Sequence, residues 1–282
     1  MQALDKYINE IKTLPPAPRI LPQLLVALSE DDVPASQIMD LIFVDPGLTA
    51  KVLQRCNTAD AALDHPVVDL HEAVTRMGLN AIYRLVAVVI GEGMLGSEQA
   101  GYGISSGGLW EHSVTTAVAA RVIAKKLGNN DDLAFTVGLL HDIGKLVLSK
   151  FLEGSQHDIE VKTESDGLSF LEAEKSILGV EHSEIGGRIL QRWNFPENFV
   201  KAVWYHHDPA GANPYQALAA CVHLGDIIAH NMGHAQGFES FAIVPRAEAL
   251  EILEVTPTDI DMFLMDTTLA LEQLNIFTPA KA

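Results

Sequence analysis

The chain has 282 residues, 48% of them hydrophobic, which is enough apolar material for one large or two modest folded domains. Its 37 acidic and 19 basic residues give a formal net charge of −18, which argues against nonspecific binding to nucleic acid or to an anionic membrane. The apolar runs are far shorter than the roughly 20 residues of a membrane span, no signal peptide is apparent, and the two cysteines make no disulfide framework, so we expect a cytoplasmic protein without membrane association.

The first third of the chain has the apolar periodicity of helices, interrupted by proline and glycine. Two consecutive prolines in the segment 14–18 are expected to end the first helix. Asp45 and Pro46 are suited to the N-cap and the first residue of a later helix. Gly78 is expected to end one helix and Asn80 to cap the apolar helix that follows. The helices predicted here are 2–13, 20–29, 37–44, one from residue 46, 71–77 and 80–89.

The segment 91–108 contains seven glycines, and we predict a boundary or hinge there. Beyond it, further helices are predicted at 110–127, from Asp131 or Asp132 as N-cap through Leu140-His-Asp, and at 165–178, 182–193, 196–207, 215–232, 247–254 and 257–274. No run has the period-2 alternation of a strand. The sequence therefore predicts an all-α fold of about a dozen helices in two lobes. The expected parts are an N-terminal lobe (1–100), a second lobe (101–235) and C-terminal helices packed on it (236–282).

The segment 137–148 places His141 and Asp142 at the centre of an apolar run. An ionised aspartate in apolar surroundings costs several kcal/mol unless a partner compensates it. A bound cation is one such partner, and a hydrogen-bonded core pair is the alternative. The sequence downstream of Gly108 offers more polar residues that interrupt apolar helical faces. Together they form a candidate set of metal ligands: His112, His141, Asp142, His182, His206, His207 and Asp226.

Histidine and carboxylate together suit Fe, Mn, Zn and similar divalent ions. His206 and His207 are adjacent, so on a helix they would diverge by about 100° and address two ions, or one ion and a substrate. His223 lies three residues before Asp226 on the same predicted helix face, and it is an alternative ligand from that helix.

The segment Leu139-Leu-His-Asp-Ile-Gly-Lys-Leu146 resembles the signature of the HD superfamily of metal-dependent phosphohydrolases. Other motifs, in the same order, are similar to HDOD domains, the HD-related output domains of bacterial signalling proteins. These motifs are Leu14-Pro-Pro-Ala-Pro18, the segments 44–57 and 70–81, Trp110-Glu-His112, the segment 181–187 and Trp204-Tyr-His-His-Asp208. The resemblance covers roughly residues 14 to 230 and implies a multi-helical, two-lobed domain.

HDOD domains are usually regarded as regulatory, and many have lost the HD ligands that this chain keeps. Compared with the related HD-GYP cyclic-di-GMP phosphodiesterases, the seven candidate ligands stand at the ligand positions in the right order. Two features depart from that pattern: the segment 208–214 replaces the Gly-Tyr-Pro motif, and Gly108 stands where some of those enzymes have a glutamate. These departures argue against cyclic-di-GMP hydrolysis and against a third metal.

The resemblance implies two divalent ions, Fe or Mn foremost, with Zn, Ni and Mg as alternatives. Asp142 would bridge them, with His112, His141 and Asp226 on one ion and His182, His206 and His207 on the other. In an enzyme, Asp142 and Lys145 are the candidate catalytic residues, with Lys145 binding a phosphate oxygen; the alternative for Lys145 is a surface lysine. Glu181 and Glu184 flank His182 and could orient its imidazole, although solvent exposure is favoured for both.

Two functions follow from the resemblance. The first is a bacterial signal-transduction protein that acts by binding a protein partner or a nucleotide-type small molecule, with metal as support or sensor. The N-terminal lobe favours it, because residues 14–94 contain no cluster of catalytic residue types. The alternative is a metal-dependent phosphohydrolase acting on a nucleotide or cyclic dinucleotide. The sequence leaves enzymatic activity, partner and oligomeric state open.

Overall fold

The computed structural model of the chain describes residues 6–7, 9–11, 20–29, 39–42, 45–59, 67–234, 237–239 and 245–274. Every regular element in these ranges is a helix, and the extended segments among them form a single isolated antiparallel bridge, between Gln99 and Ile104. The prediction of an all-α fold is confirmed. The Pro-rich segment 14–18 and most of the predicted helices 2–13 and 37–44 lie outside the described residues.

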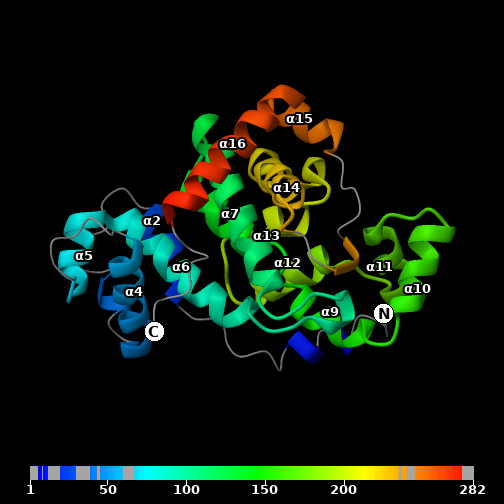
Figure 1. Cartoon of the computed structure of the whole chain (residues 1–282), viewed down its shortest axis with the longest axis horizontal. Coiled ribbons are helices and arrows are strands. Elements are labelled where there is room, and N and C mark those ends of the chain that lie inside the picture. Colours follow the sequence, from blue (N-terminus) through cyan, green and yellow to red (C-terminus); the bar gives the residue numbers. More distant parts are fainter. Residues whose placement is uncertain are drawn as a thin grey trace.

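The N-terminal helices gather on one side of the molecule, around α6 (Figure 1). They are α2 (Ile20–Ser29), α4 (Pro46–Ala59), α5 (Leu70–Met77) and α6 (Leu79–Leu95). α6 is apolar along most of its length, and its buried residues include Ile82, Tyr83 and Val86. α2, α4 and α5 all pack against it, so α6 is the core helix of this part.

The centre of the molecule is built around α7 (Gly108–Lys126), which packs against α8 (Asp131–Leu140) on one side and α14 (Gln216–Asn231) on another. Next to them lie α9 (Lys145–Leu152), α12 (His182–Arg192) and α13 (Glu197–Trp204). α15 (Ala247–Leu253) packs on α14, and α16 (Pro257–Leu274) packs on α7 (Figure 1).

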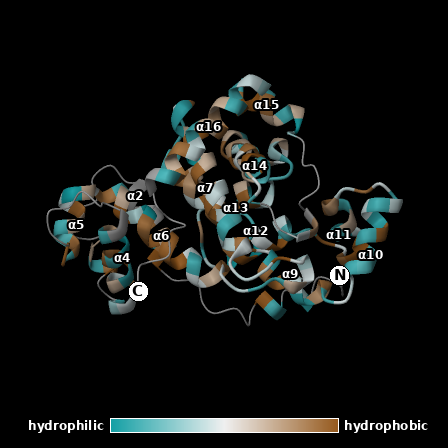
Figure 2. Ribbon diagram, in the orientation of Figure 1, coloured by the Kyte–Doolittle hydropathy of each residue, from teal (hydrophilic) through white to brown (hydrophobic). Residues whose placement is uncertain are grey.

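Shorter elements complete the described chain. They are the 3₁₀ helices η1 (Ala100–Tyr102), η3 (Pro209–Ala212) and η4 (Gly237–Glu239), the π-helix η2 (Val161–Ser165), α10 (Gln156–Glu160) and α11 (Phe170–Leu178). Most helices carry both apolar and polar segments, as expected for helices that bury one face (Figure 2).

The N-caps of two helices, α8 and α6, differ from the predicted ones. Asn130 is the N-cap of α8, because its side-chain oxygen accepts from the Leu133 backbone N–H at 2.9 Å; the expected cap at Asp131 or Asp132 is wrong. Gly78 is the N-cap of α6, so the expected cap at Asn80 is also wrong. α6 continues past residue 89 to Leu95, because its buried face continues there.

Among the described residues, no single helix is long and apolar enough to cross a membrane. Only α5 and α6 taken together pass such a test of length and composition, and they meet at a bend of 118°.

α14 approaches α7 closely at Gly225. A Cβ atom at this position would lie 2.9 Å from both the Thr116 carbonyl oxygen and the Ala120 backbone nitrogen. Real Cβ atoms do not approach backbone atoms so closely, so the spacing of these two helices depends on the missing side chain. Asp226 is the next residue of α14, and this contact therefore sets its position relative to α7.

We predict that Gly225→Ala lowers the free energy of unfolding by about 1–3 kcal/mol, because the added methyl group overpacks the α7–α14 contact. Gly93→Ala in α6 is the matched control, since its Cβ would meet no atom within 4 Å. The control is expected to be neutral or stabilising by up to about 1 kcal/mol, through the higher helix propensity of alanine. Urea unfolding of both variants tests this, and equal midpoints would show that the contact does not limit the helix spacing.

Candidate metal centre

The structure brings all seven predicted ligand residues together at the centre of the molecule, from five segments of the chain. The segments are α7 (His112), the turn between α8 and α9 (His141, Asp142), the start of α12 (His182), the turn after α13 (His206, His207) and α14 (Asp226). His207 is half-buried, and the other six are at most 5% exposed. The site therefore lies inside the helical core.

His141 and Asp142 lie in a turn and not inside a helix as the sequence predicted. α8 ends at Leu140, and α9 begins at Lys145. Gly144 closes the turn against the start of α12, because a Cβ there would lie 1.9 Å from the His182 carbonyl oxygen. The missing side chain lets α12 approach, and His182 Nε2 comes within 3.2 Å of Asp142 Oδ1.

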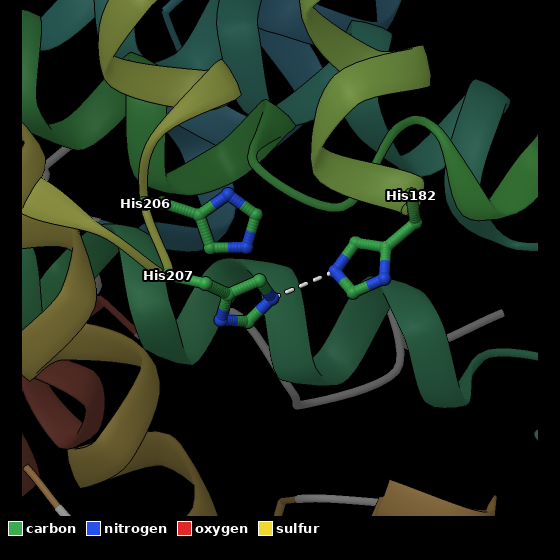
Figure 3. A group of neighbouring side chains, drawn as sticks. All are labelled: His182, His206 and His207. Carbon is green, nitrogen blue, oxygen red and sulfur yellow. Dashed lines mark hydrogen bonds between the residues drawn. The ribbon is translucent and has the colours of Figure 1, made fainter. Parts of the chain in front are cut away.

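Two groups of potential ligands lie on either side of Asp142. In the first group, His112 Nε2 lies 3.1 Å and His141 Nε2 lies 3.8 Å from Asp226 Oδ1. In the second group, His182, His206 and His207 face one another, with 2.9 Å between the Nε2 atoms of His182 and His207 (Figure 3). Within each group the ligand atoms lie within 4.8 Å of one another.

Asp142 connects the two groups through its separate oxygen atoms. Its Oδ2 lies 3.5 Å from His112 Nε2 and 3.3 Å from His141 Nε2, while its Oδ1 faces His182. His141, Asp142 and His206 form a third overlapping set of ligand atoms between the two groups. The arrangement has the shape of two adjacent sites that share one carboxylate.

Two of the rings are oriented by the free carbonyl groups at helix ends. His141 Nδ1 donates to the Gly138 carbonyl and His206 Nδ1 to the Val203 carbonyl, both at 2.7 Å. Each ring therefore directs Nε2 inward, where neither Nε2 atom has a hydrogen-bond partner within the described residues. Buried polar atoms without partners are rare and call for an explanation. A divalent ion bound by these imidazole nitrogens fits that requirement.

The charges of the site compensate one another. Burial would raise the pKa of both aspartates, but His141 and Lys145 hold the pKa of Asp142 well below its usual value, and His230 and His112 do the same for Asp226. Both carboxyl groups are thus held as carboxylates, the form that binds a cation.

The histidines divide into two kinds. Burial lowers the pKa of His206 and His207 well below the ordinary value, which keeps these rings neutral, as metal ligands must be. Burial opposes the charge on His182 as well, but Glu174 and Asp142 outweigh it and raise the pKa to about 10. Asp142 likewise outweighs burial and raises the pKa of His141.

The other sequence hypotheses have different outcomes. Lys145 is 2% exposed and donates from Nζ to Asp142 Oδ2 at 2.6 Å, so the surface-lysine alternative is wrong.

His223 donates from Nδ1 to the His206 carbonyl and accepts at Nε2 from the Arg246 backbone N–H. Neither of its nitrogens is left for a metal, so its role as an alternative ligand is not supported. Glu181 pairs with Lys175, and Glu184 pairs with Arg188.

Sequence reasoning missed two residues of the site. Glu174 of α11 is fully buried, and its Oε2 lies 3.0 Å from His182 Nδ1. His230 of α14 places Nδ1 3.1 Å from Asp226 Oδ1. The signals were present: Glu174 is an acidic residue on the apolar face of an amphipathic helix, and His230 follows Asp226 by one helical turn.

We predict that Lys145→Met lowers the free energy of unfolding of the metal-free protein by roughly 3 kcal/mol, because it removes one partner of a buried ion pair. Lys150→Met on the same helix is the control. Lys150 is paired with Glu10 but its side chain is 66% exposed, so the expected loss is at most about 1 kcal/mol. Denaturant unfolding in the presence of a chelator measures both, and similar losses for the two variants would contradict the assignment of a buried pair.

Comparisons with known proteins address the family and the fold of the chain. The model of the HDOD domain family matches residues 14–209. An uncharacterized protein of Treponema pallidum is 28% identical over 226 residues, which are 76% of this chain and 42% of that protein. Ribonuclease Y of Thermus thermophilus is 30% identical over 141 residues, which are 50% of this chain and 20% of that protein. The chain thus spans less than half the length of these curated relatives.

Among solved structures, an HDOD domain protein with unknown function from Geobacter sulfurreducens superposes with a TM-score of 0.71. The alignment covers 98% of this chain and 97% of that one at 23% sequence identity, so it shows a common fold. The family model covers well over half of the sequence, and the structure has the same helical architecture. The chain therefore belongs to the HDOD family.

Proposed function

We propose that this chain is a bacterial regulatory HDOD protein whose HD-type metal centre supports or senses its conformation, and which acts by binding a protein partner or a nucleotide-type small molecule. One observation carries the proposal: the candidate ligands come from five separate segments of the chain, α7 among them. An ion bound by all of them stabilises only the conformation in which they meet, so metal occupancy is linked to the state of the whole lobe.

The proposed centre holds two divalent ions. His112, His141 and Asp226 would hold one, His182, His206 and His207 the other, and Asp142 would contribute to both. Imidazole nitrogens with carboxylate oxygens favour Fe or Mn, with Zn, Ni and Mg as alternatives. The inward Nε2 atoms of His141 and His206, which have no hydrogen-bond partner in the described part of the chain, support this assignment.

We propose that the chain has three parts, residues 1–100, 101–235 and 236–282. The packing of α2, α4 and α5 on α6 supports the first part, and the packing of α15 on α14 and of α16 on α7 supports the third as helices that cover the metal-binding lobe. The N-terminal helices would then present the recognition surface.

A second candidate function is metal-dependent phosphohydrolysis of a nucleotide or cyclic dinucleotide. The specific observation in its favour is Asp142, whose two oxygens face different ligand groups. Two bound ions of this kind lower the pKa of a coordinated water and neutralise charge on a phosphoryl group. The similarity to Ribonuclease Y, which covers one fifth of that protein, also favours this second function. The half-buried His207 would be the ligand nearest an entering substrate.

Metal content and hydrolysis together test the two functions. We expect elemental analysis of the purified protein to find divalent metal, and we expect Asp142→Ala to lose it and to lower the melting temperature, with no hydrolysis of bis(p-nitrophenyl) phosphate by either protein. Asp166→Ala, an exposed aspartate, is the control and is expected to keep the metal. Hydrolysis by the parent protein that is lost in Asp142→Ala would replace the regulatory function by the second candidate. Absence of metal from the parent, even after incubation with Fe²⁺ or Mn²⁺, would overturn the metal centre itself.

Metal binding should also release protons. In the metal-free protein the pKa of His182 is raised to about 10, which keeps this ring protonated at neutral pH, and the pKa of His141 is raised as well. A metal ion binds only the neutral ring. The affinity for Mn²⁺ is therefore expected to rise with pH through the neutral range, by about tenfold per pH unit for each proton displaced. Calorimetric titration at pH 7.5 in buffers of different ionisation enthalpy measures this release, and a heat independent of the buffer would contradict it.

A further inference from the structure

Glu174 is fully buried, and it belongs to neither of the two groups of candidate metal ligands. Binding of a metal ion would therefore not by itself explain why a carboxylate is buried here. Three donors converge on it. The His182 backbone N–H donates to Oε2 at 2.9 Å, His182 Nδ1 lies 3.0 Å from the same oxygen, and the Tyr102 hydroxyl donates to Oε1. An ionised carboxylate accepts hydrogen bonds and donates none, so His182 Nδ1 carries the proton.

His182 needs this partner because of its position at the start of a helix. His141 and His206 follow helix ends and donate to the carbonyls of Gly138 and Val203, three residues earlier. His182 is the first residue of α12, where the backbone offers unpaired N–H groups and no such carbonyl. Glu174 supplies the missing acceptor for Nδ1 and at the same time accepts from the orphan N–H of His182.

In the neutral His182 ring, the form that binds a metal ion, Nδ1 keeps the proton and the lone pair is on Nε2. This atom lies 2.9 Å from His207 Nε2 and 3.2 Å from Asp142 Oδ1, which is where the second ligand group converges. The carboxylate therefore selects the ring tautomer and the ring orientation that a metal ion in this group requires.

Tyr102 holds Glu174 through its hydrogen bond to Oε1. It lies in η1, which is held tightly against α9: the Gly101 N–H donates to Ser149 Oγ at 3.1 Å, and a Cβ at Gly101 would lie 1.9 Å from the Ser149 carbonyl oxygen. The Tyr102 ring also lies 5.7 Å from Lys145 Nζ. The segment between α6 and α7 thus contacts partners of both Asp142 and His182.

We propose that Glu174, held by Tyr102, is a positioning residue that sets the affinity of the His182–His206–His207 group for its divalent ion. The inference rests on the metal centre of the proposed function. It adds a residue of α11 and a residue of η1 to the determinants of that centre, neither of which is itself a ligand.

Competition titration with Mn²⁺ and a chelator tests the proposal. In Glu174→Gln we expect one of the two Mn²⁺ ions to bind 10–100-fold more weakly, the usual effect of losing a partner that orients a ligand, and the other ion to bind as in the parent. Glu181→Gln is the matched control: it is the neighbour of His182 and its side chain pairs with Lys175, so both ions are expected to bind normally. Tyr102→Phe is expected to weaken the same ion by a smaller factor.

The melting temperature of the metal-free variants and the visible spectrum of the Co²⁺ forms separate positioning from folding. We expect Glu174→Gln to change the Co²⁺ absorption of one ion only, and Glu174→Asp to restore part of the affinity. A parent protein that binds no metal would remove the proposed function and this inference with it. A parent that binds two ions while Glu174→Gln binds both equally well would overturn the inference alone. Equal loss of both ions together with a lower metal-free melting temperature would also overturn it, by making Glu174 a structural residue.

Discussion

The interaction on which this structure depends is the compensation of two carboxylates buried in a helical core. Asp142 and Asp226 are each at most 2% exposed. An isolated charge there would cost several kcal/mol, so each needs charged and hydrogen-bonding partners at close range. Asp142 finds Lys145, His141 and His182, and Asp226 finds His112 and His230. His182 and His112 come from other helices than the carboxylates they face, so full compensation is reached only when these helices meet at this point.

The packing of the helices is arranged to make that meeting possible. Gly225 lets α14 lie against α7, which brings Asp226 to His112. Gly144 lets α12 lie against the turn that carries Asp142, which brings in His182. Each of these glycines lies in close backbone contact with a neighbouring segment. Gly225 is next to Asp226, and Gly144 is two residues from Asp142. Close packing and charge compensation are therefore set by the same few positions.

The residue types of the site could be predicted from the sequence, because histidines and two aspartates in apolar helical segments are conspicuous. Whether each of these residues lies in a helix or in a turn could not be predicted. His141 follows the last residue of α8 but keeps helical backbone angles (φ −56°, ψ −37°). A residue in a turn with helical angles needs no special residue type, so the sequence does not distinguish this turn from a continuing helix. Glu174 was missed for a different reason: it lies eight residues before His182, and only the packing of α11 beside the start of α12 brings the two together. The glutamates nearest in sequence, Glu181 and Glu184, instead face lysine and arginine at the surface.

Of the contacts between the N-terminal helices and the candidate metal centre, two lead to segments that carry His141 and His182. In the first, Tyr83 of α6 forms a buried hydrogen bond with Thr136 of α8 at 2.6 Å, and α8 leads directly into His141. In the second, the chain leaves α6 for η1, where Tyr102 contacts Glu174 and through it His182. A partner bound to the N-terminal helices and a metal bound at the centre would both favour the conformation in which these contacts are made. Because coupling free energies are reciprocal, a metal that held His141 and His182 in place would also favour the arrangement of α6 that a partner would meet. Under the proposed function, this reciprocal coupling is how a metal bound at the centre would serve a regulatory domain, with or without hydrolysis at the site.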